Sequence, residues 1–221
     1  ACNNRCTFCA LGEKRRDVGL VPRDEVLRRM HAAFAAGGGL VLTGGEPTIH
    51  PLFFEILDAA KRRPIRHLMI NTNGVRIARE PEFVTRLATY MPRFEVYLQF
   101  DGFSEDVSQK LRGARIVDDK LRTIDRLGAR GIRTTLVCTV QAGVNDHEIG
   151  AILKFAAERP HITGVSYQPA TYTGRNVKPE TLEARVTFPD VVKAIEAQTD
   201  GLFRVEDFMP LPCAHPNCHT L

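Results

Sequence analysis

Half of the six cysteines in this 221-residue chain lie within eight positions of one another, as Cys2, Cys6 and Cys9 in "CNNRCTFC". Disulfides are disfavoured because three clustered cysteines leave one unpaired. Structural zinc usually takes four ligands, commonly from paired C-x2-C knuckles. Burial as plain apolar residues is disfavoured by the polar neighbours. The fourth interpretation is an iron–sulfur cluster, because three thiolates on a four-iron cluster leave one iron open for chemistry.

A second motif, "TGGEP", follows the first strand-like run of the chain. Gly44 and Gly45 permit backbone torsions and a close approach that a Cβ atom would forbid. Glu46 then presents acceptors at the C-terminal end of a strand, where parallel α/β folds gather their sites. A carboxylate beside exposed carbonyls suits an ammonium group. The alternative is an ordinary strand-to-helix turn with a solvent-facing glutamate.

The elements that must position these motifs alternate between strand and helix patterns. Apolar, β-branched or aromatic runs that end in Gly, Pro or small polar residues predict strands at 39–47, 65–74, 94–102, 132–141 and 162–170. Helical patterns occupy 22–37, 50–63, 80–90, 118–131, 145–159 and 189–199. Repeated strand-then-helix order with right-handed crossovers predicts an α/β fold with a parallel sheet, either a barrel or a doubly wound sheet.

Polar side chains stand near the ends of the predicted strands. "NTNG" contains Asn73, and "YLQFDG" places Tyr97, Gln99 and Asp101 on one face by alternation. In a barrel that face lines the lumen, where a core would prefer apolar residues, so these polar residues indicate ligand contact. Cys138 lies within an apolar strand and is predicted to be a core residue.

The spacing C-x3-C-x2-C, with the aromatic Phe8 before the last cysteine, resembles the signature of the radical S-adenosylmethionine superfamily. "GGEP" at 44–47 resembles that family's second motif, and the resemblance extends over at least residues 1–170. It implies a [4Fe-4S] cluster on Cys2, Cys6 and Cys9, whose free iron is chelated by S-adenosylmethionine. One electron then cleaves the cofactor to methionine and a 5′-deoxyadenosyl radical, which abstracts hydrogen from a substrate.

The same resemblance implies a partial (β/α)6 TIM-like barrel. Family barrels place one strand before the cysteine loop, so the first strand is expected to be missing or upstream of this chain. We expect a core barrel over 1–172 and a C-terminal extension over 173–221.

Roles for individual residues also come from the resemblance. Glu46 is expected to bind the methionine amino group, and Gln99 or Asp101 the ribose hydroxyls. Arg112 in "KLRG" is a candidate for the methionine carboxylate, and a surface arginine is the alternative. The other expected cofactor-binding residues are Phe8, Gly44, Gly45, Asn73, Thr139, Gln141 and Gln168. No residue is assigned to the chemistry of the substrate.

A closer resemblance rests on "VYLQFDG", "KLRG", "QPATYTGR" and "PCAHPNC". Together they are similar to a branch that holds archaeal tetraether-lipid synthases and pterin-methylating relatives. Cys213 and Cys218 then suggest half of an auxiliary iron centre, and a turn with two incidental cysteines is the alternative. The implied substrate is a small molecule or a lipid: lipid-like, pterin-like or another unactivated carbon.

Composition excludes few classes of protein. The net charge is +4 without a dense basic stripe, so a nucleic-acid partner is unlikely. No transmembrane segment is predicted, since a span needs roughly 18 apolar residues. We expect a cytoplasmic, oxygen-sensitive enzyme that receives electrons from a flavodoxin or ferredoxin. The alternative class is an iron–sulfur electron-transfer or binding module without radical catalysis, although such modules are usually short and use four cysteines per cluster.

Overall fold

A computed structural model describes residues 2–10, 19–35, 39–172, 175 and 183–209. Within them, five parallel strands form one sheet in the order of the chain. The strands are β1 (Gly39–Leu42), β2 (His67–Thr72), β3 (Phe94–Gln99), β4 (Arg133–Val140) and β5 (Ile162–Pro169). The helices are α1 (Arg23–Ala35), α2 (Phe53–Lys61), α3 (Val75–Arg79), α4 (Pro81–Ala88), α5 (Glu105–Arg112), α6 (Val117–Ala129), α7 (Ile149–Ala157) and α8 (Phe188–Gln198). Short 3-10 helices lie at Pro47–Ile49, Asp146–Glu148 and Val205–Asp207.

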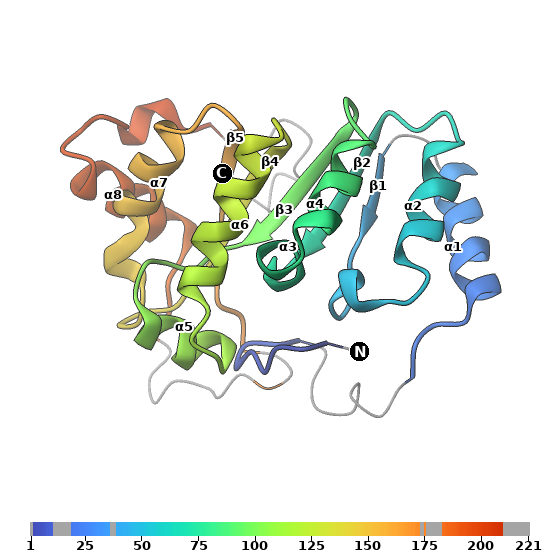
Figure 1. The fold of residues 1–221 in the computed structure, drawn as a ribbon. Coiled ribbons are helices and arrows are strands. Elements are labelled where there is room, and N and C mark those ends of the chain that lie inside the picture. The colour runs from blue at the N-terminus through green and yellow to red at the C-terminus, as the bar shows by residue number, and fades with distance from the viewer. Residues whose placement is uncertain (1, 11–18, 36–38, 173–174, 176–182, 210–221) are drawn as a thin grey trace.

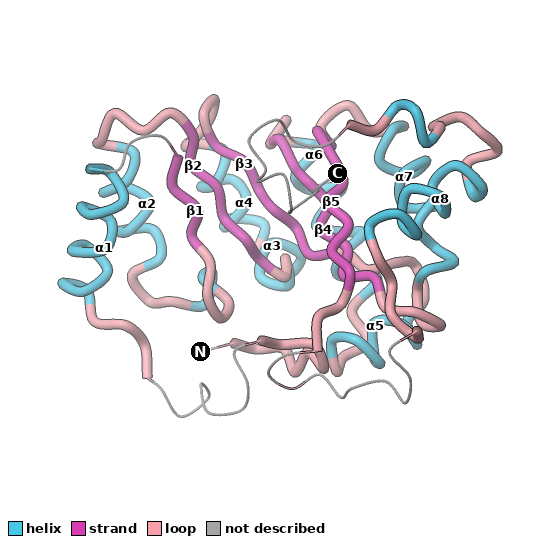
Figure 2. The backbone as a smooth tube through the Cα atoms, turned by 180° about the vertical axis from the view of Figure 1, so that it is seen from behind, coloured by secondary structure: helices cyan, strands magenta, loops and turns pink. Residues whose placement is uncertain are grey.

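The helices cover one face of the sheet, and the strands lie in front of them when the molecule is seen from behind (Figures 1 and 2). The alternation along β3 explains this layering. Phe94, Val96 and Leu98 are fully buried in the core that the helices share, whereas Tyr97 and Gln99 on the other face are only half-buried. We call this second face the inner face of the sheet. The α/β partial barrel predicted from the sequence is confirmed, with five strands at the expected places.

All five strands run in the same direction, so their C-terminal ends meet at one edge of the sheet. The segment that carries Cys2, Cys6 and Cys9 crosses near α5 at this edge (Figure 1). Neither α3 nor α5 appears among the helices predicted above. Helix α3 follows β2 and packs against α6, and α5, which follows β3, contacts the cysteine segment through its C-terminal end.

Helix α8 lies in the region predicted to be a C-terminal extension, and it packs against α7. Val191 and Ile195 of α8 belong to the same hydrophobic core as the sheet, and the side chain of Gln198 accepts a hydrogen bond from the backbone N–H of Gly150 at 2.8 Å. A Thr187–Asp190 capping box fixes the start of the helix. The division at residue 172 stays a prediction. In the described part of the chain, no helix is long and apolar enough to span a bilayer.

Candidate active site

The cysteine segment is fixed to the C-terminal end of α5 by main-chain hydrogen bonds. The N–H of Arg5 donates to the carbonyl of Arg112 at 3.0 Å, and that of Thr7 to Leu111 at 2.9 Å. Gly113 ends α5 with a φ of 71°. A Cβ atom at Gly113 would lie 3.0 Å from the Cβ of Arg5, so only glycine permits both the left-handed turn and this close approach.

The three cysteines of this segment are free thiols with donor chemistry suited to an iron–sulfur cluster. Cys2 is exposed, and Cys6 and Cys9 are half-buried. Partial burial raises the pKa of Cys2, the N–H of Asn4 lowers it, and the neighbouring Cys6 raises it further. In the described residues no three His, Cys, Asp or Glu side chains converge on one ion position. In a four-iron cluster each cysteine binds a different iron, so the three thiols need not converge on one ion.

Glu46 is buried, at 4% exposure, and its carboxylate is held by two neighbouring segments. Oε1 accepts hydrogen bonds from the backbone and hydroxyl of Thr48 and from the hydroxyl of Thr72. Oε2 accepts one, from the backbone N–H of Asn73 at 2.7 Å. Gly44 before it has a φ of 128° with open space where a Cβ would be. This is not the solvent-facing turn of the alternative interpretation, because Glu46 is buried and, among the described residues, Oε2 accepts a single hydrogen bond and so has a lone pair left.

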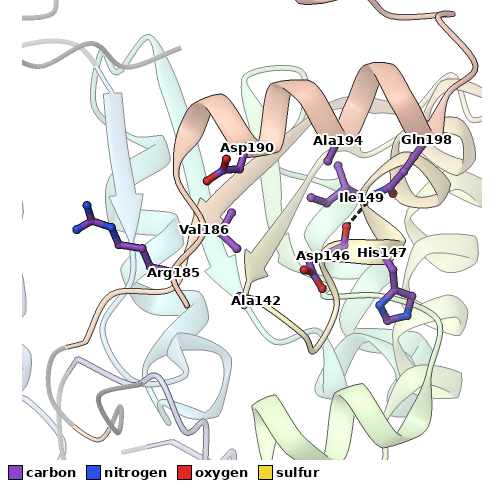
Figure 3. A pocket seen from close by; sticks show the side chains of 9 residues that line it. All are labelled: Ala142, Asp146, His147, Ile149, Arg185, Val186, Asp190, Ala194 and Gln198. Atoms are coloured by element: carbon purple, nitrogen blue, oxygen red, sulfur yellow. Dashed lines mark hydrogen bonds between the residues drawn. The ribbon is translucent and has the colours of Figure 1, made fainter. Parts of the chain in front are cut away.

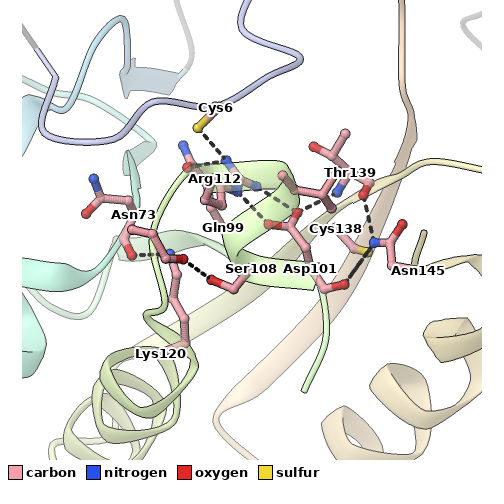
Figure 4. A network of polar contacts seen from close by, with 12 residues as sticks. Cys6, Asn73, Gln99, Asp101, Ser108, Arg112, Lys120, Cys138, Thr139 and Asn145 are labelled. Atoms are coloured by element: carbon pink, nitrogen blue, oxygen red, sulfur yellow. Dashed lines mark hydrogen bonds and ion pairs between the residues drawn. The ribbon is translucent and has the colours of Figure 1, made fainter. Parts of the chain in front are cut away.

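Arg112 and Asp101 form a buried ion pair that also reaches a cysteine (Figure 4). The guanidinium donates from Nε and Nη2 to the two carboxylate oxygens of Asp101. Its Nη1 donates to Oε1 of Gln99 at 2.7 Å and to Sγ of Cys6 at 3.7 Å. Burial alone would lower the pKa of Arg112, but Asp101 raises it above the ordinary value, so the group stays charged. The ring of Phe8 lies 4.7 Å from the guanidinium.

The other predicted residues lie near the ends of β4 and β5. Thr139 is buried, and its N–H donates to Asp101; it is paired in register with Gln168, which is exposed on β5. Gln141 follows β4 and donates its N–H to the side chain of Asn145. Cys138, predicted to be a core residue, is fully buried, and burial raises its pKa.

Asn145 is wholly buried and braces the ends of two strands. Its Nδ2 group donates to the carbonyls of Asp101 at 2.8 Å and Thr139 at 2.9 Å, and to Sγ of Cys138 at 3.6 Å. Its side chain therefore joins the end of β3 to the end of β4.

Two residues of the site were not identified from the sequence. Asn3 accepts a hydrogen bond from the side chain of Asn73 at 2.7 Å. Lys120 of α6 is buried and donates to the carbonyl of Asn73. A signal for Lys120 was present, because it falls on the apolar stripe of its helix with Val117, Ile124 and Leu127. The auxiliary pair Cys213 and Cys218 lies outside the described residues.

Two pockets border this region. One of about 500 Å³ adjoins the cysteine segment at Asn3 and is lined by His50, Arg76 and Arg79 among others. The second, of about 360 Å³, lies between the loop after β4 and helix α8, where His147 and Asp190 line it (Figure 3). Neither contains a cysteine.

The fold and the site together define an α/β partial barrel with three free thiols near the C-terminal edge of its strands. The chain belongs to the radical SAM superfamily, because the sequence model of that family matches residues 1–156. Members of this superfamily use a [4Fe-4S] cluster and S-adenosylmethionine.

Curated relatives support this placement. The chain is 32% identical over 227 residues to a 7,8-dihydro-6-hydroxymethylpterin dimethyltransferase of Methanocaldococcus jannaschii, covering 97% of this chain and 43% of that protein. It is 31% identical over 163 residues to the mycofactocin maturase MftC of Mycobacterium ulcerans, covering 71% of this chain and 41% of the relative. The GTP 3′,8-cyclase of Edwardsiella ictaluri is 44% identical over 85 residues, which cover 36% of this chain and 26% of the cyclase. The chain thus spans less than half the length of these relatives.

Solved structures share the fold. Streptococcus suis SuiB bound to S-adenosylmethionine superposes with a TM-score of 0.68 at 21% identity, covering 90% of this chain and 44% of that one. The enzyme anSMEcpe with bound AdoMet gives a TM-score of 0.67 at 16% identity, covering 90% and 57% of the two chains.

Proposed function

We propose that this protein is a radical S-adenosylmethionine enzyme whose cluster is held by Cys2, Cys6 and Cys9. The observation that carries the proposal is the arrangement of the cysteine segment: three free thiols are fixed over α5, with the buried Arg112 donating to Cys6. When bound, the cluster supplies one electron that cleaves S-adenosylmethionine to methionine and a 5′-deoxyadenosyl radical, which takes a hydrogen atom from the substrate.

The protein's own residues bind and orient the cofactor in this proposal. The unused lone pair on Oε2 of Glu46 accepts from the methionine ammonium. Gln99, half-buried on the inner face, is better placed for the ribose than Asp101, whose two oxygens are both engaged by Arg112. Arg112 makes four hydrogen bonds within the protein, so it meets the methionine carboxylate only with its remaining N–H. Phe8, Gly44, Gly45, Asn73, Thr139, Gln141 and Gln168 complete the proposed cofactor contacts.

We further propose that the substrate is polar, as a pterin-like ring is, and not a lipid chain. The support is the inner face of the sheet, where Asn71 and Gln99 are joined by a hydrogen bond of 3.2 Å and Tyr97 lies beside them in register. Tyr97 is half-buried on this face, as is Ser166 of β5, and each adds a hydroxyl group to it. An alkyl chain would leave these groups unpaired. The relative from Methanocaldococcus jannaschii, whose match covers 97% of this chain, is named for a dihydropterin.

The remaining parts of the proposal concern the whole protein. An electron donor such as a flavodoxin or ferredoxin reduces the cluster, and the enzyme works in the cytoplasm and loses activity in oxygen. Residues 1–172 form the core barrel, and 173–221 begin an extension in which Cys213 and Cys218 supply half of an auxiliary iron centre.

Iron content tests the cluster assignment. Full-length protein reconstituted without oxygen is expected to hold about four iron and four sulfide ions at this site. Replacing Cys2, Cys6 and Cys9 together by Ala should remove that amount, and replacing Cys138, which is buried on the helix side of β4, should not. Unchanged iron in the triple variant, or zinc in its place, contradicts the assignment.

Release of 5′-deoxyadenosine separates catalysis from simple electron transfer. Reduced protein should release this product from S-adenosylmethionine, slowly even without substrate. Protein that holds the cluster and passes electrons but forms no 5′-deoxyadenosine would favour the electron-transfer module instead. For the substrate, 7,8-dihydro-6-hydroxymethylpterin and a long-chain phospholipid are the two probes, each assayed for acceleration of product release. Acceleration by the lipid alone would overturn the polar assignment.

A further inference from the structure

Lys120 is a buried cation in the middle of the apolar stripe of α6. Its exposure is 4%, and its ammonium group donates to the backbone carbonyl of Asn73. One turn later in the helix, the hydroxyl of Thr123 donates to the carbonyl of Gly74 at 2.8 Å. Two side chains of α6 therefore hold two consecutive carbonyls of the loop that follows β2.

Asn73 connects this loop to both motifs of the site. Its backbone N–H donates to Oε2 of Glu46 at 2.7 Å, and its Nδ2 group donates to Oδ1 of Asn3 at 2.7 Å. Asn3 directly follows Cys2 in the chain. Asn73 is itself 1% exposed, so water does not compete for these bonds. One buried residue thus fixes the carboxylate behind the site and the start of the cysteine segment, and Lys120 fixes that residue.

Packing alone does not explain a lysine at this position. Burying an ammonium group is unfavourable, and a methionine or leucine would fill the same stripe at lower cost. The titratable groups around Lys120 are Arg112 of α5, Asp101 after β3, Glu46 after β1 and Cys6 of the cysteine segment. Burial and the charge of Arg112 lower the pKa of Lys120 to about 7, while Asp101, Glu46 and Cys6 raise it. Lys120 therefore lies near the carboxylates of Asp101 and Glu46, and their attraction offsets part of the cost of burying its amino group.

We propose that Lys120 is a positioning residue for cofactor binding: by holding the backbone of Asn73, it sets Glu46 and Asn3 in place. This rests on the proposed function for the identity of the cofactor. Lys120 itself touches neither the cysteines nor the expected position of S-adenosylmethionine, and it acts through Asn73.

Lys120→Met in the full-length protein tests the proposal, with Thr123→Val as its matched control. Both substitutions remove one hydrogen bond from α6 to the same loop, but only the first removes a charge and frees Asn73. Hydrogen exchange of the Asn73 amide is measured first, in protein without S-adenosylmethionine. We expect this amide to lose protection in Lys120→Met and to keep it in Thr123→Val.

The second measurement is the affinity for S-adenosylmethionine by equilibrium dialysis, together with iron content. We expect Lys120→Met to weaken binding about tenfold, the effect of one charge-assisted hydrogen bond, at unchanged iron content. Thr123→Val should bind as the unaltered protein does. Equal affinity in Lys120→Met, or equal exchange at Asn73, overturns the proposal.

The two measurements distinguish failure of this inference from failure of the proposed function. If the unaltered protein does not bind S-adenosylmethionine, the proposed function falls, and the exchange of Asn73 still decides whether Lys120 positions it. If Lys120→Met does not fold, Lys120→Leu, which also lacks an N–H donor, takes its place in both measurements.

Discussion

Arg112 and Asp101 face each other in a bidentate ion pair, with Nε 2.5 Å from Oδ2 and Nη2 2.7 Å from Oδ1, and each side chain is 4% exposed. The pair joins the end of α5 to the end of β3, and the N–H of Thr139 adds β4 through a third contact with Asp101. The backbone of the cysteine segment donates a hydrogen bond to the carbonyl of Arg112, so this ion pair also helps to fix the position of the segment.

Asp101→Ala and Gln99→Ala should therefore separate structure from binding. Loss of Asp101 leaves the guanidinium buried and unpaired, which should lower the free energy of unfolding by about 3–5 kcal/mol. Gln99→Ala removes one partner of Arg112 from a half-buried position, so about 1 kcal/mol is expected, with a clear loss of S-adenosylmethionine affinity. Urea unfolding and equilibrium dialysis measure the two effects. Full affinity in Gln99→Ala would return the ribose contact to Asp101.

Glu46→Gln preserves the shape of the side chain but removes its charge. The amide oxygen can still accept from Thr48 and Thr72, but the new NH2 group cannot accept from the N–H of Asn73, so the free energy of unfolding should fall by about 1–3 kcal/mol while iron content stays unchanged. Its attraction for an ammonium group is lost, and S-adenosylmethionine affinity should fall by roughly ten- to a hundredfold, the equivalent of a charged hydrogen bond. Parallel loss of iron would show that Glu46 supports the cysteine segment and not the cofactor.

Gly113→Ala and Gly131→Ala form a matched pair of backbone tests. Both glycines have left-handed φ angles, 71° and 63°, so each substitution should cost about 1 kcal/mol of conformational strain. Only the new Cβ at position 113 meets Arg5; the one at 131 has open space. We expect reduced iron incorporation in Gly113→Ala alone. Equal iron content in the two variants would mean that the segment tolerates displacement from α5.

The pH dependence of the free energy of unfolding should reveal the lowered pKa of Lys120. Its pKa is about 7 in the folded protein against an ordinary value of 10.5. Between these values the unfolded chain binds a proton that the folded chain has released, so stability from this group rises with pH. In cofactor-free protein, the free energy of unfolding of the unaltered chain minus that of Lys120→Met should increase from about pH 7 to 10.5. A flat difference would show that Lys120 keeps its ordinary pKa.

The strands could be predicted from the sequence, because apolar runs and Gly or Pro at their ends are properties of short segments. The prediction of a strand over 39–47 extended past β1, which stops at Leu42; the turn that begins with the left-handed Gly44 interrupts it. Helix α5 was missed although Ser104 caps it and Gly113 ends it. Its two apolar buried residues, Val107 and Leu111, give too weak a stripe for a periodicity argument.

The candidate site also has one part that short segments of sequence reveal and another part that they do not. Cysteine spacing and the "GGEP" motif are local, so the sequence alone makes Cys2, Cys6, Cys9 and Glu46 candidates for the site. The contacts that hold them are not local. Arg112 reaches Cys6 across more than a hundred positions of chain, and Lys120 reaches Asn73 across 47. Only the folded arrangement shows that Arg112 pairs with Asp101 and that Asn145 joins two strand ends.

The alternation along β3 has a consequence for how such a protein can change over generations. Val96 and Leu98 point to the helices and contribute to stability, while Tyr97 and Gln99, one position away, point to the inner face. A substitution at Tyr97 alters the inner face of the sheet without opening a cavity in the core. New substrate preferences can therefore accumulate on one set of positions while the other set is held fixed by selection for folding.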